Sequence, residues 1–250
     1  VKPYICPRDY NVVIGNTLYQ VDIGPYDPWA HVLDEYRQHQ DIEIKTAPAR
    51  CVNGANVVRA GRDIIIDKDW LKDYQYNNDF PDYRVRVLGN GGHLDGCFAT
   101  LRPGLILANH YFDDYATTFP GWEVVMLDNP TYRASAYTGY KQPYPVYNGK
   151  FWDTTVGTNK SFNQHIIQHA LDWVGNYTET YFELNCLSIN ESNVIMLAEN
   201  EQLANDLAQR GITVHWVPFR ARCFWDGGVH CLTVDIRRQS TLEDYFPQRG

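Results

Sequence analysis

Short apolar runs alternate with longer amphipathic stretches along this chain of 250 residues. The short runs are rich in β-branched and aromatic residues and are separated by turn residues, a pattern typical of strands. The predicted strands are Asn11–Ile14, Leu18–Val21, Asn56–Val58, Asp63–Ile66, Tyr83–Leu88, Cys97–Leu101, Leu105–Ala108, Asn190–Leu197, Thr213–Val217 and His230–Ile236. Helices are predicted over residues 27–38, 67–76, 162–174 and 200–211. Asp27 and Asn200 supply the N-caps of two of these helices.

The order of these elements repeats a strand–turn–strand–helix–strand unit about five times. A recurring supersecondary unit favours a circular or stacked arrangement. A doubly wound sheet is the default alternative, but the chain has no glycine-rich loop of the dinucleotide-binding or P-loop type. We therefore expect an α/β protein whose residues 1–250 form a single domain.

One segment interrupts this repeat. Residues 128–160 are rich in Tyr, Pro, Gly and Thr, and together with the helix predicted after them they form an insertion over residues 128–180. A long irregular stretch inside a compact domain is usually either a functional lid or disordered. The many aromatic side chains favour an ordered lid.

Composition and charge narrow the classes of partner. The formal charge of −8 argues against a nucleic-acid partner and is suited to a cationic ligand. No apolar run is long enough to cross a membrane, and no signal-peptide pattern opens the chain. The 6 cysteines are scattered without a C-x-x-C pair, which predicts reduced thiols in a cytoplasmic protein rather than a zinc site or a disulfide framework.

The segment D-G-G-V-H-C-L-T-V-D-I-R-R, which contains Cys231, is the first candidate for chemistry. A cysteine that enters a strand directly after a Gly-Gly turn can place its sulfur in a cleft, with backbone N–H groups nearby. Reactive thiolates need such an electropositive, partly exposed setting. The alternative is that Cys231 is a small buried hydrophobe in an apolar strand.

The segment G-G-H-L-D-G is the second candidate. In a strand, His93 and Asp95 would face the same way, so a carboxylate could bind a guanidinium while the imidazole moves protons. The alternative is a hydrogen-bonded pair at a strand end. Asp9, in C-P-R-D, is a third acidic candidate, or a plain turn residue.

Taken together, these motifs resemble the glycine amidinotransferase family. The matching stretches, in family order, are Pro7–Asp9 with Val13–Asn16, Cys51–Asp63, His93–Asp95 with Pro103 and Gly104, Cys186–Asn190, and Gly227–Cys231 with Asp235–Arg238 and Thr241. They cover nearly the whole chain apart from the tyrosine-rich segment. The resemblance implies a five-bladed α/β propeller of ββαβ units around a central active site, the fold of the guanidine-modifying superfamily.

The resemblance also implies roles for individual residues. Cys231 would attack the guanidinium carbon to form a covalent amidino thioether, and His93 would act as its acid and base. Asp9 and Asp95 would hold the planar guanidinium over the sulfur by charge-assisted hydrogen bonds. Ser188 is a lesser candidate for contacting the substrate.

The partners implied are a small-molecule guanidine donor and an amine acceptor, without a nucleic acid or a membrane; a homodimer is left open. No metal or organic cofactor is implied. His165 and His169 stand one helical turn apart, a spacing that metal sites use. However, the chain has no Glu in the zincin position and no evident third ligand.

Two positions depart from the family pattern. Asn53 stands where the family usually has an acid. Its amide can orient an imidazole or hydrogen-bond a guanidinium, so Asn53 is a candidate for substrate binding, but it cannot stabilise an imidazolium by charge. Phe112 falls at the place of an arginine that grips the substrate carboxylate in the family. The carboxylate would then be bound elsewhere, or the substrate differs.

The resemblance favours an enzyme that moves an amidino group from L-arginine, or a related guanidine, to an amine such as glycine. A deiminase or dihydrolase is the alternative within enzymes, since it forms the same covalent intermediate but lets water attack. The Gly227–Arg238 stretch favours the transferase. A non-catalytic guanidine-binding relative is a third hypothesis, raised by Asn53.

Overall fold

The computed structural model describes two compact units that interleave along the chain. The described residues are 6–22, 24, 27–39, 42–47, 53–67, 80–88, 93–109, 114–128, 161, 164, 181–197, 199–218, 227–239 and 242–249. The first unit, called the Cys231 unit here, comprises the described residues of Cys6–Asp95, Asp114–Trp122 and Cys231–Gly250. The second, called the Ser188 unit, comprises those of Gly96–Asp113 and Glu123–His230.

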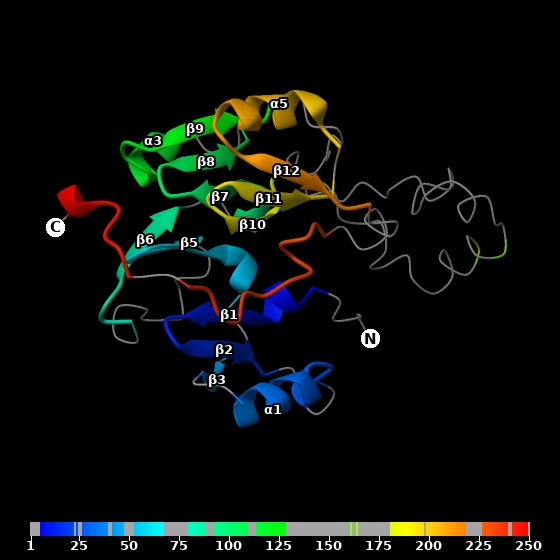
Figure 1. Ribbon diagram of the computed structural model, residues 1–250. Coiled ribbons are helices and arrows are strands. Elements are labelled where there is room, and N and C mark those ends of the chain that lie inside the picture. The colour runs from blue at the N-terminus through cyan, green and yellow to red at the C-terminus, as the bar shows by residue number, and fades with distance from the viewer. Residues whose placement is uncertain are drawn as a thin grey trace. The chain divides into compact units, whose positions relative to one another are not determined.

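A three-stranded sheet near the N-terminus shows the topology on which the fold is built (Figure 1). Strands β1 (Asn11–Ile14) and β2 (Thr17–Val21) form an antiparallel hairpin, in which Val13 lies opposite Leu18. Helix α1 (Ala30–His39) follows in the chain, and β3 (Glu43–Ala47) then pairs with β2 in parallel. The order is therefore ββαβ.

Three more sheets of the described chain repeat an antiparallel hairpin followed by a parallel third strand. In the Cys231 unit these strands are β4 (Val57–Ala60), β5 (Asp63–Asp67) and β6 (Arg84–Leu88). In the Ser188 unit they are β7 (Phe98–Arg102), β8 (Leu105–Ala108), β9 (Glu123–Met126), β10 (Leu187–Asn190), β11 (Asn193–Met196) and β12 (Thr213–Trp216). The predicted recurrence is thus confirmed for four sheets, whereas a fifth unit and a closed propeller stay predictions.

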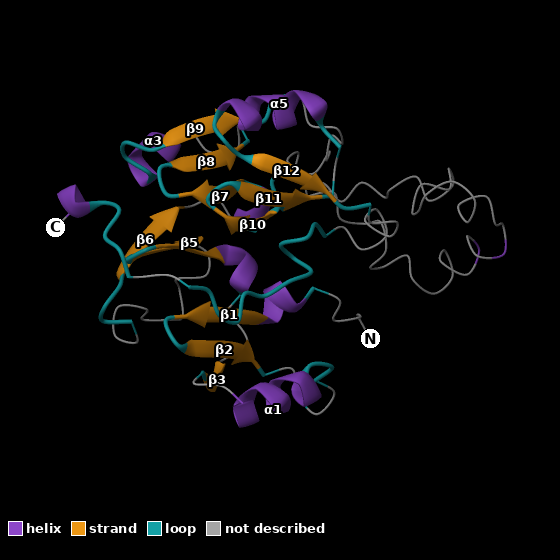
Figure 2. Cartoon of the chain, in the orientation of Figure 1, coloured by secondary structure: helices purple, strands orange, loops and turns teal. Residues whose placement is uncertain are grey.

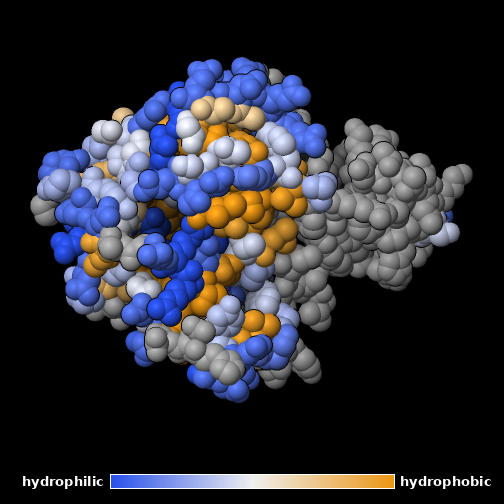
Figure 3. Space-filling view, in the orientation of Figure 1, coloured by the Kyte–Doolittle hydropathy of each residue, from blue (hydrophilic) through white to orange (hydrophobic). Residues whose placement is uncertain are grey.

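Helix α5 (Glu201–Gln209) follows from the pattern of its own sequence. The side chain of Asn200 accepts a hydrogen bond from the backbone N–H of Leu203 at 3.0 Å, which confirms it as the N-cap. Leu203 and Leu207 are buried in the core, while the outward face of the helix is hydrophilic (blue at the top of Figure 3). The helix therefore covers the apolar side of its own sheet.

Each unit has its own apolar core. In the Ser188 unit the core includes twelve buried residues and joins β7, β8, β9, β11 and α5, with Leu107, Met196 and Leu207 fully buried and with Val214 and Trp216 of β12 partly buried against it. In the Cys231 unit the hairpins β1–β2 and β4–β5 share a cluster that includes Val12, Ile64 and Ile66. These cores leave the loops at the strand ends to carry polar side chains.

Two strand predictions are wrong, and a third is confirmed only in part. Residues 227–239 form turns and irregular backbone instead of a strand, and they are drawn as loop in Figure 2. Their alternating apolar side chains have another cause, because Val234 and Ile236 pack against the cluster of Val13, Leu18 and Leu33. The strand predicted over residues 190–197 is confirmed for β11, but Asn190 ends β10 and a turn separates the two strands. The strand predicted at His93 and Asp95 is wrong, because Asp95 lies in a 3₁₀ helix that directly follows His93.

Helix α1 begins later than predicted, at Ala30. Asp27 and Pro28 form the turn before it, where the Asp27 carboxylate accepts a hydrogen bond from the Trp29 N–H at 2.8 Å. The helix predicted after Asp67 lies outside the described residues. Of residues 128–180, the structure describes only Asp128, Ser161 and Gln164. None of the described helices is long and apolar enough to cross a membrane.

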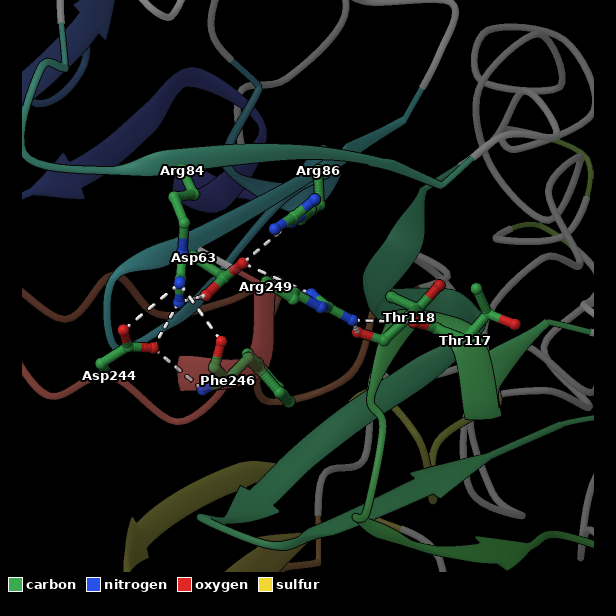
Figure 4. Close-up of polar contacts among 8 residues, drawn as sticks. All are labelled: Asp63, Arg84, Arg86, Thr117, Thr118, Asp244, Phe246 and Arg249. Carbon is green, nitrogen blue, oxygen red and sulfur yellow. Dashed lines mark hydrogen bonds and ion pairs between the residues drawn. The ribbon is translucent and has the colours of Figure 1, made fainter.

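A buried carboxylate fixes the C-terminal segment, residues 242–249, to the β4–β6 sheet (Figure 4). Asp63 is 0 % exposed and forms ion pairs with Arg84 at 2.6 Å, Arg86 at 3.1 Å and Arg249 at 3.3 Å. Arg84 also binds Asp244, and Arg249 donates to the carbonyl of Thr117 at 2.8 Å. A buried charge is tolerated when it is paired in this way, and these contacts anchor the far end of the segment that begins at Cys231.

Candidate active site

Asp9 lies on a short 3₁₀ helix, η1 (Pro7–Tyr10), next to the start of β1. Proline at its first position fixes the backbone, and the Asn11 amide donates to the Pro7 carbonyl at 2.9 Å. The Arg8 N–H donates to the carbonyl of Cys231 at 3.3 Å. The turn that carries Asp9 is therefore tied directly to the backbone of the candidate nucleophile.

A second 3₁₀ helix, η2 (Gly54–Asn56), packs against η1. Its N-cap is Asn53, whose side-chain oxygen accepts the Ala55 N–H at 2.9 Å. Gly54 is required by close approach: a Cβ there would lie 2.3 Å from the Asn11 carbonyl oxygen and 2.6 Å from that of Arg8. The glycine of this motif thus serves to bring η2 against η1.

A third 3₁₀ helix, η4 (Leu94–Gly96), carries Asp95 and directly follows His93. The buried Asn56 side chain accepts the Leu94 N–H at 3.3 Å and so links η2 to this turn. The prediction that His93 and Asp95 share one face of a strand is therefore wrong. Both residues nevertheless belong to the Cys231 unit, as do Asp9 and Asn53.

Cys231 and Asp95 are in contact although 136 residues separate them in sequence. The thiol donates to the carboxylate at 3.5 Å, and the two residues are 5 % and 4 % exposed. A thiol and a carboxylate buried together can both face one planar cation, because the cation offers N–H donors and an electrophilic carbon.

The surroundings of Cys231 disfavour its thiolate in the free protein. A hydrogen bond with the Cys6 thiol, burial, and the negative charges of Asp95 and Asp9 raise the pKa of Cys231 well above its ordinary value. A bound cation would neutralise the two carboxylates and remove that part of the shift. The site is therefore suited to a cationic ligand.

His93 is oriented by Asn53. The Asn53 amide nitrogen lies 3.3 Å from Nε2 of His93, and the amide oxygen is occupied by the Ala55 N–H. The amide therefore presents its N–H₂ group to Nε2 of the ring, and which ring nitrogen carries the proton depends on the tautomer. An acid at position 53 would accept from the ring instead.

The other residues of the sequence prediction are not tested by this geometry. Ser188 belongs to the Ser188 unit, where its hydroxyl on β10 donates to the Thr100 carbonyl on β7 at 3.0 Å. Its contact with a substrate stays a prediction. Phe112 and the histidines at 165 and 169 lie outside the described residues, and within those the structure describes no group of His, Cys, Asp and Glu that could hold a metal.

Cys6 and Arg8 are neighbours of the site that the sequence did not single out. Cys6 directly precedes η1, and its thiol contributes to the raised pKa of Cys231. The buried Arg8 side chain pairs with Asp235 at 3.5 Å, and Arg238 pairs with the same carboxylate at 2.8 Å. Against the effect of burial, these two guanidinium groups hold the pKa of Asp235 below its ordinary value. The sequence signal for Cys6 and Arg8 was their place in the C-P-R-D segment that contains Asp9.

The arrangement agrees with comparisons to known proteins, although no protein-family model matches the chain. The chain is 22% identical to the amidinotransferase SxtG of the saxitoxin biosynthetic pathway of Microseira wollei, with a TM-score of 0.67 over 97% of this chain and 72% of that one. It is 19% identical to the inosamine-phosphate amidinotransferase of Streptomyces griseus, with a TM-score of 0.67 over 96% and 70%. The chain therefore has the fold of solved amidinotransferases.

A curated relative extends the likeness to the sequence. Mitochondrial glycine amidinotransferase of Gallus gallus is 25% identical over 289 aligned residues, which are 96% of this chain and 60% of the relative. The resemblance to the glycine amidinotransferase family predicted from the motifs is thus confirmed along nearly the whole chain. The chain spans 60% of the length of that relative.

Proposed function

We propose that this protein is an amidinotransferase that moves an amidino group from L-arginine, or a related guanidine, to an amine acceptor such as glycine. The observation that carries the proposal is the buried contact of the Cys231 thiol with the Asp95 carboxylate at 3.5 Å, with the charge of Asp9 acting on the same sulfur. The likeness to amidinotransferases in fold and in sequence supports it.

In this proposal Asp9 and Asp95 bind the guanidinium by charge-assisted hydrogen bonds. Two carboxylates that accept from different N–H groups of a planar cation fix the plane as well as the position of its carbon. Asp95 already contacts the sulfur, so a guanidinium bound to it lies beside the nucleophile. Binding also supplies the positive charge that the free site lacks, so the thiol ionises more readily once the substrate is present.

The reaction then proceeds in two balanced halves. His93 takes the proton of the Cys231 thiol, the thiolate attacks the guanidinium carbon, and the same proton passes to the leaving nitrogen as its C–N bond breaks. In the second half the acceptor amine gives a proton to His93 and attacks the same carbon. The C–S bond breaks, and the proton returns to the sulfur.

Asn53 affects both halves through His93. Its amide holds the ring in one orientation, because the amide oxygen is fixed by the Ala55 N–H. It does not stabilise the imidazolium that exists between the two proton transfers, since it carries no charge and presents N–H donors to the ring. Asn53 therefore orients the His93 ring but does not raise the proton affinity of that ring.

The remaining parts of the proposal concern the surroundings of the site. We include Ser188 as a substrate contact and a closed five-bladed α/β propeller of ββαβ units within one catalytic domain, supported by the four described sheets of the required topology. The likeness in fold to amidinotransferases supports the same arrangement. A homodimer and a cytoplasmic location are also part of the proposal. The free thiols of Cys6, Cys97, Cys186 and Cys231 are suited to a reducing compartment.

One assay separates transfer from its alternatives. The protein is incubated with L-arginine, with and without glycine or other amines, and the products are identified. Transfer gives ornithine and a new guanidine that depends on the amine, whereas hydrolysis gives citrulline or ammonia without it. Cys231→Ser is expected to abolish turnover, and Cys186→Ser, which changes a buried thiol of the other unit, to retain it. Full turnover by Cys231→Ser would refute the proposal.

A further inference from the structure

Asn56 links two parts of the site that lie far apart in the sequence. It is the last residue of η2, it is 1 % exposed, and its side-chain oxygen accepts the N–H of Leu94 at 3.3 Å. Leu94 stands between His93 and Asp95 and is fully buried as well. One hydrogen bond therefore fixes the backbone that joins the proposed acid–base residue to a proposed guanidinium anchor.

The turn that carries Asn56 is rigid. The Asn56 N–H donates to the Asn53 carbonyl at 2.9 Å, which closes the turn of η2. Gly54 lies in the same turn and packs so closely against η1 that a Cβ there would lie 2.3 Å from the Asn11 carbonyl oxygen. The oxygen of Asn56 therefore holds the Leu94 N–H in one place, because the backbone beneath it has no room to move.

Asn53 and Asn56 act on consecutive residues of the site. The Asn53 amide nitrogen lies 3.3 Å from Nε2 of the His93 ring, whereas Asn56 binds the backbone of Leu94. Together, η2 and its N-cap thus position both the side chain and the main chain at this point.

The amide nitrogen of Asn56 has no comparable contact. It is buried, and it forms no hydrogen bond within the part of the chain that the structure describes. The amide cannot be reversed, because its nitrogen would then face the Leu94 N–H as a second donor. A buried donor without an acceptor lowers stability, and departures of this kind are expected at functional sites. The contribution of Asn56 therefore lies in its oxygen.

We propose that Asn56 is a positioning residue of the reaction: its oxygen holds the turn from His93 to Asp95 so that imidazole and carboxylate face the same guanidinium. The inference rests on the proposed amidino transfer for the identity of that cation. Asn56 acts through the Leu94 backbone and not by contact with the substrate. Asp95 in turn contacts the Cys231 thiol at 3.5 Å, so release of the turn also changes the charge beside the sulfur.

Two substitutions of nearly equal shape test the role of the oxygen. Asn56→Leu offers no acceptor, so kcat/KM should fall by about a hundredfold, with a higher KM for the guanidine. Loss of folded protein alone would lower the apparent kcat and leave KM unchanged. Asn56→Asp keeps an acceptor for the Leu94 N–H and should retain the KM of the parent. A parent-like KM in Asn56→Leu, or an equal loss in Asn56→Asp, would overturn the proposal.

Alkylation of Cys231 by iodoacetamide tests the same contact without turnover, so it separates this proposal from the proposed function. Asn56→Leu should move the midpoint of labelling to lower pH, as expected for Asp95→Asn, because the carboxylate is released from the sulfur. Asn200→Ala is the matched control. It removes a buried amide that accepts the Leu203 N–H at 3.0 Å in the Ser188 unit, so it should lower stability and leave the midpoint unchanged. A midpoint that stays at the parent value in Asn56→Leu refutes the positioning role, whether or not amidino transfer is observed.

The parent protein supplies a further test if Asn56→Leu fails to fold. Hydrogen exchange at the Leu94 amide, followed by NMR, should be slow, because this N–H is buried and donates to Asn56. Exchange as fast as that of an open loop would contradict the contact on which the proposal is built.

Discussion

At the scale of single residues, the surroundings of Cys231 favour its neutral thiol in the free protein. Its thiol contacts Asp95 at 3.5 Å, and the Cys6 thiol, burial and two carboxylates all raise its pKa. Most reactive cysteines have a lowered pKa from positive surroundings. Here the positive charge is expected from the substrate itself, which couples recognition of a guanidinium to activation of the nucleophile.

The alkylation of Cys231 should therefore depend on pH in a distinctive way. In the free protein, labelling by iodoacetamide should be slow at neutral pH and should rise only above the ordinary thiol pKa of 9.0, because the thiolate forms late. Asp95→Asn removes a negative charge beside the sulfur, so it should move the rise to lower pH. Mass spectrometry of the labelled peptide measures this, and the same midpoint in parent and variant would contradict the electrostatic account.

The pair of Asn53 and His93 gives a second prediction at this scale. Asn53→Asp should raise kcat by about tenfold, the equivalent of one pKa unit of extra stabilisation of the imidazolium. It should also move the acid limb of the pH–rate profile to higher pH, because a neighbouring carboxylate raises the pKa of the ring, which must be neutral to take the thiol proton. Asn53→Ala should lower kcat, since it loses the orienting contact at 3.3 Å. A pH–rate profile of Asn53→Asp that matches the parent would show that Asn53 is only structural.

At the scale of elements, the site is built by three short 3₁₀ helices that no strand or helix period predicts. Hairpins such as β1–β2 and β4–β5 were predictable, because apolar runs flank glycine turns at Gly15 and Gly61, both with φ of 60°. The segment after Cys231 was wrongly predicted as a strand because its apolar and polar residues alternate. The alternation arises from the packing of Val234 and Ile236 against a neighbouring cluster, without strand pairing. Strands β3 and β9 were not predicted from the sequence.

The junction of η1 with η2 can be tested at Gly54. Gly54→Ala should lower the free energy of unfolding by about 1–3 kcal/mol, because its Cβ would collide with two backbone carbonyl oxygens that cannot move independently. Denaturant unfolding measures the change. Gly121→Ala is the matched control: its φ is 80° and its Cβ would meet nothing within 4 Å, so its cost should be about 1 kcal/mol, from backbone strain alone. A smaller loss at Gly54 than at Gly121 would contradict the close approach.

At the scale of the whole molecule, the order of motifs along the chain was more informative than any single motif. The motifs predicted both the family resemblance and the residues of the Cys231 unit that lie together, although Asp95 and Cys231 are 136 residues apart. Periodicity could not predict that contact, because it depends on tertiary packing. Nor could it reveal Cys6 as a neighbour of the nucleophile, since a cysteine before a proline has no pattern that marks its role.

The most direct test of the central claim is the intact mass of the protein after brief incubation with L-arginine and no amine acceptor, followed by an acid quench. The account predicts the mass of one amidino group added to the chain, mapped by peptide analysis to Cys231 and absent from Cys231→Ser. The adduct should disappear when glycine or another competent amine is supplied before the quench. Ornithine formed with no adduct on Cys231, or an adduct that survives in Cys231→Ser, would contradict the proposed chemistry.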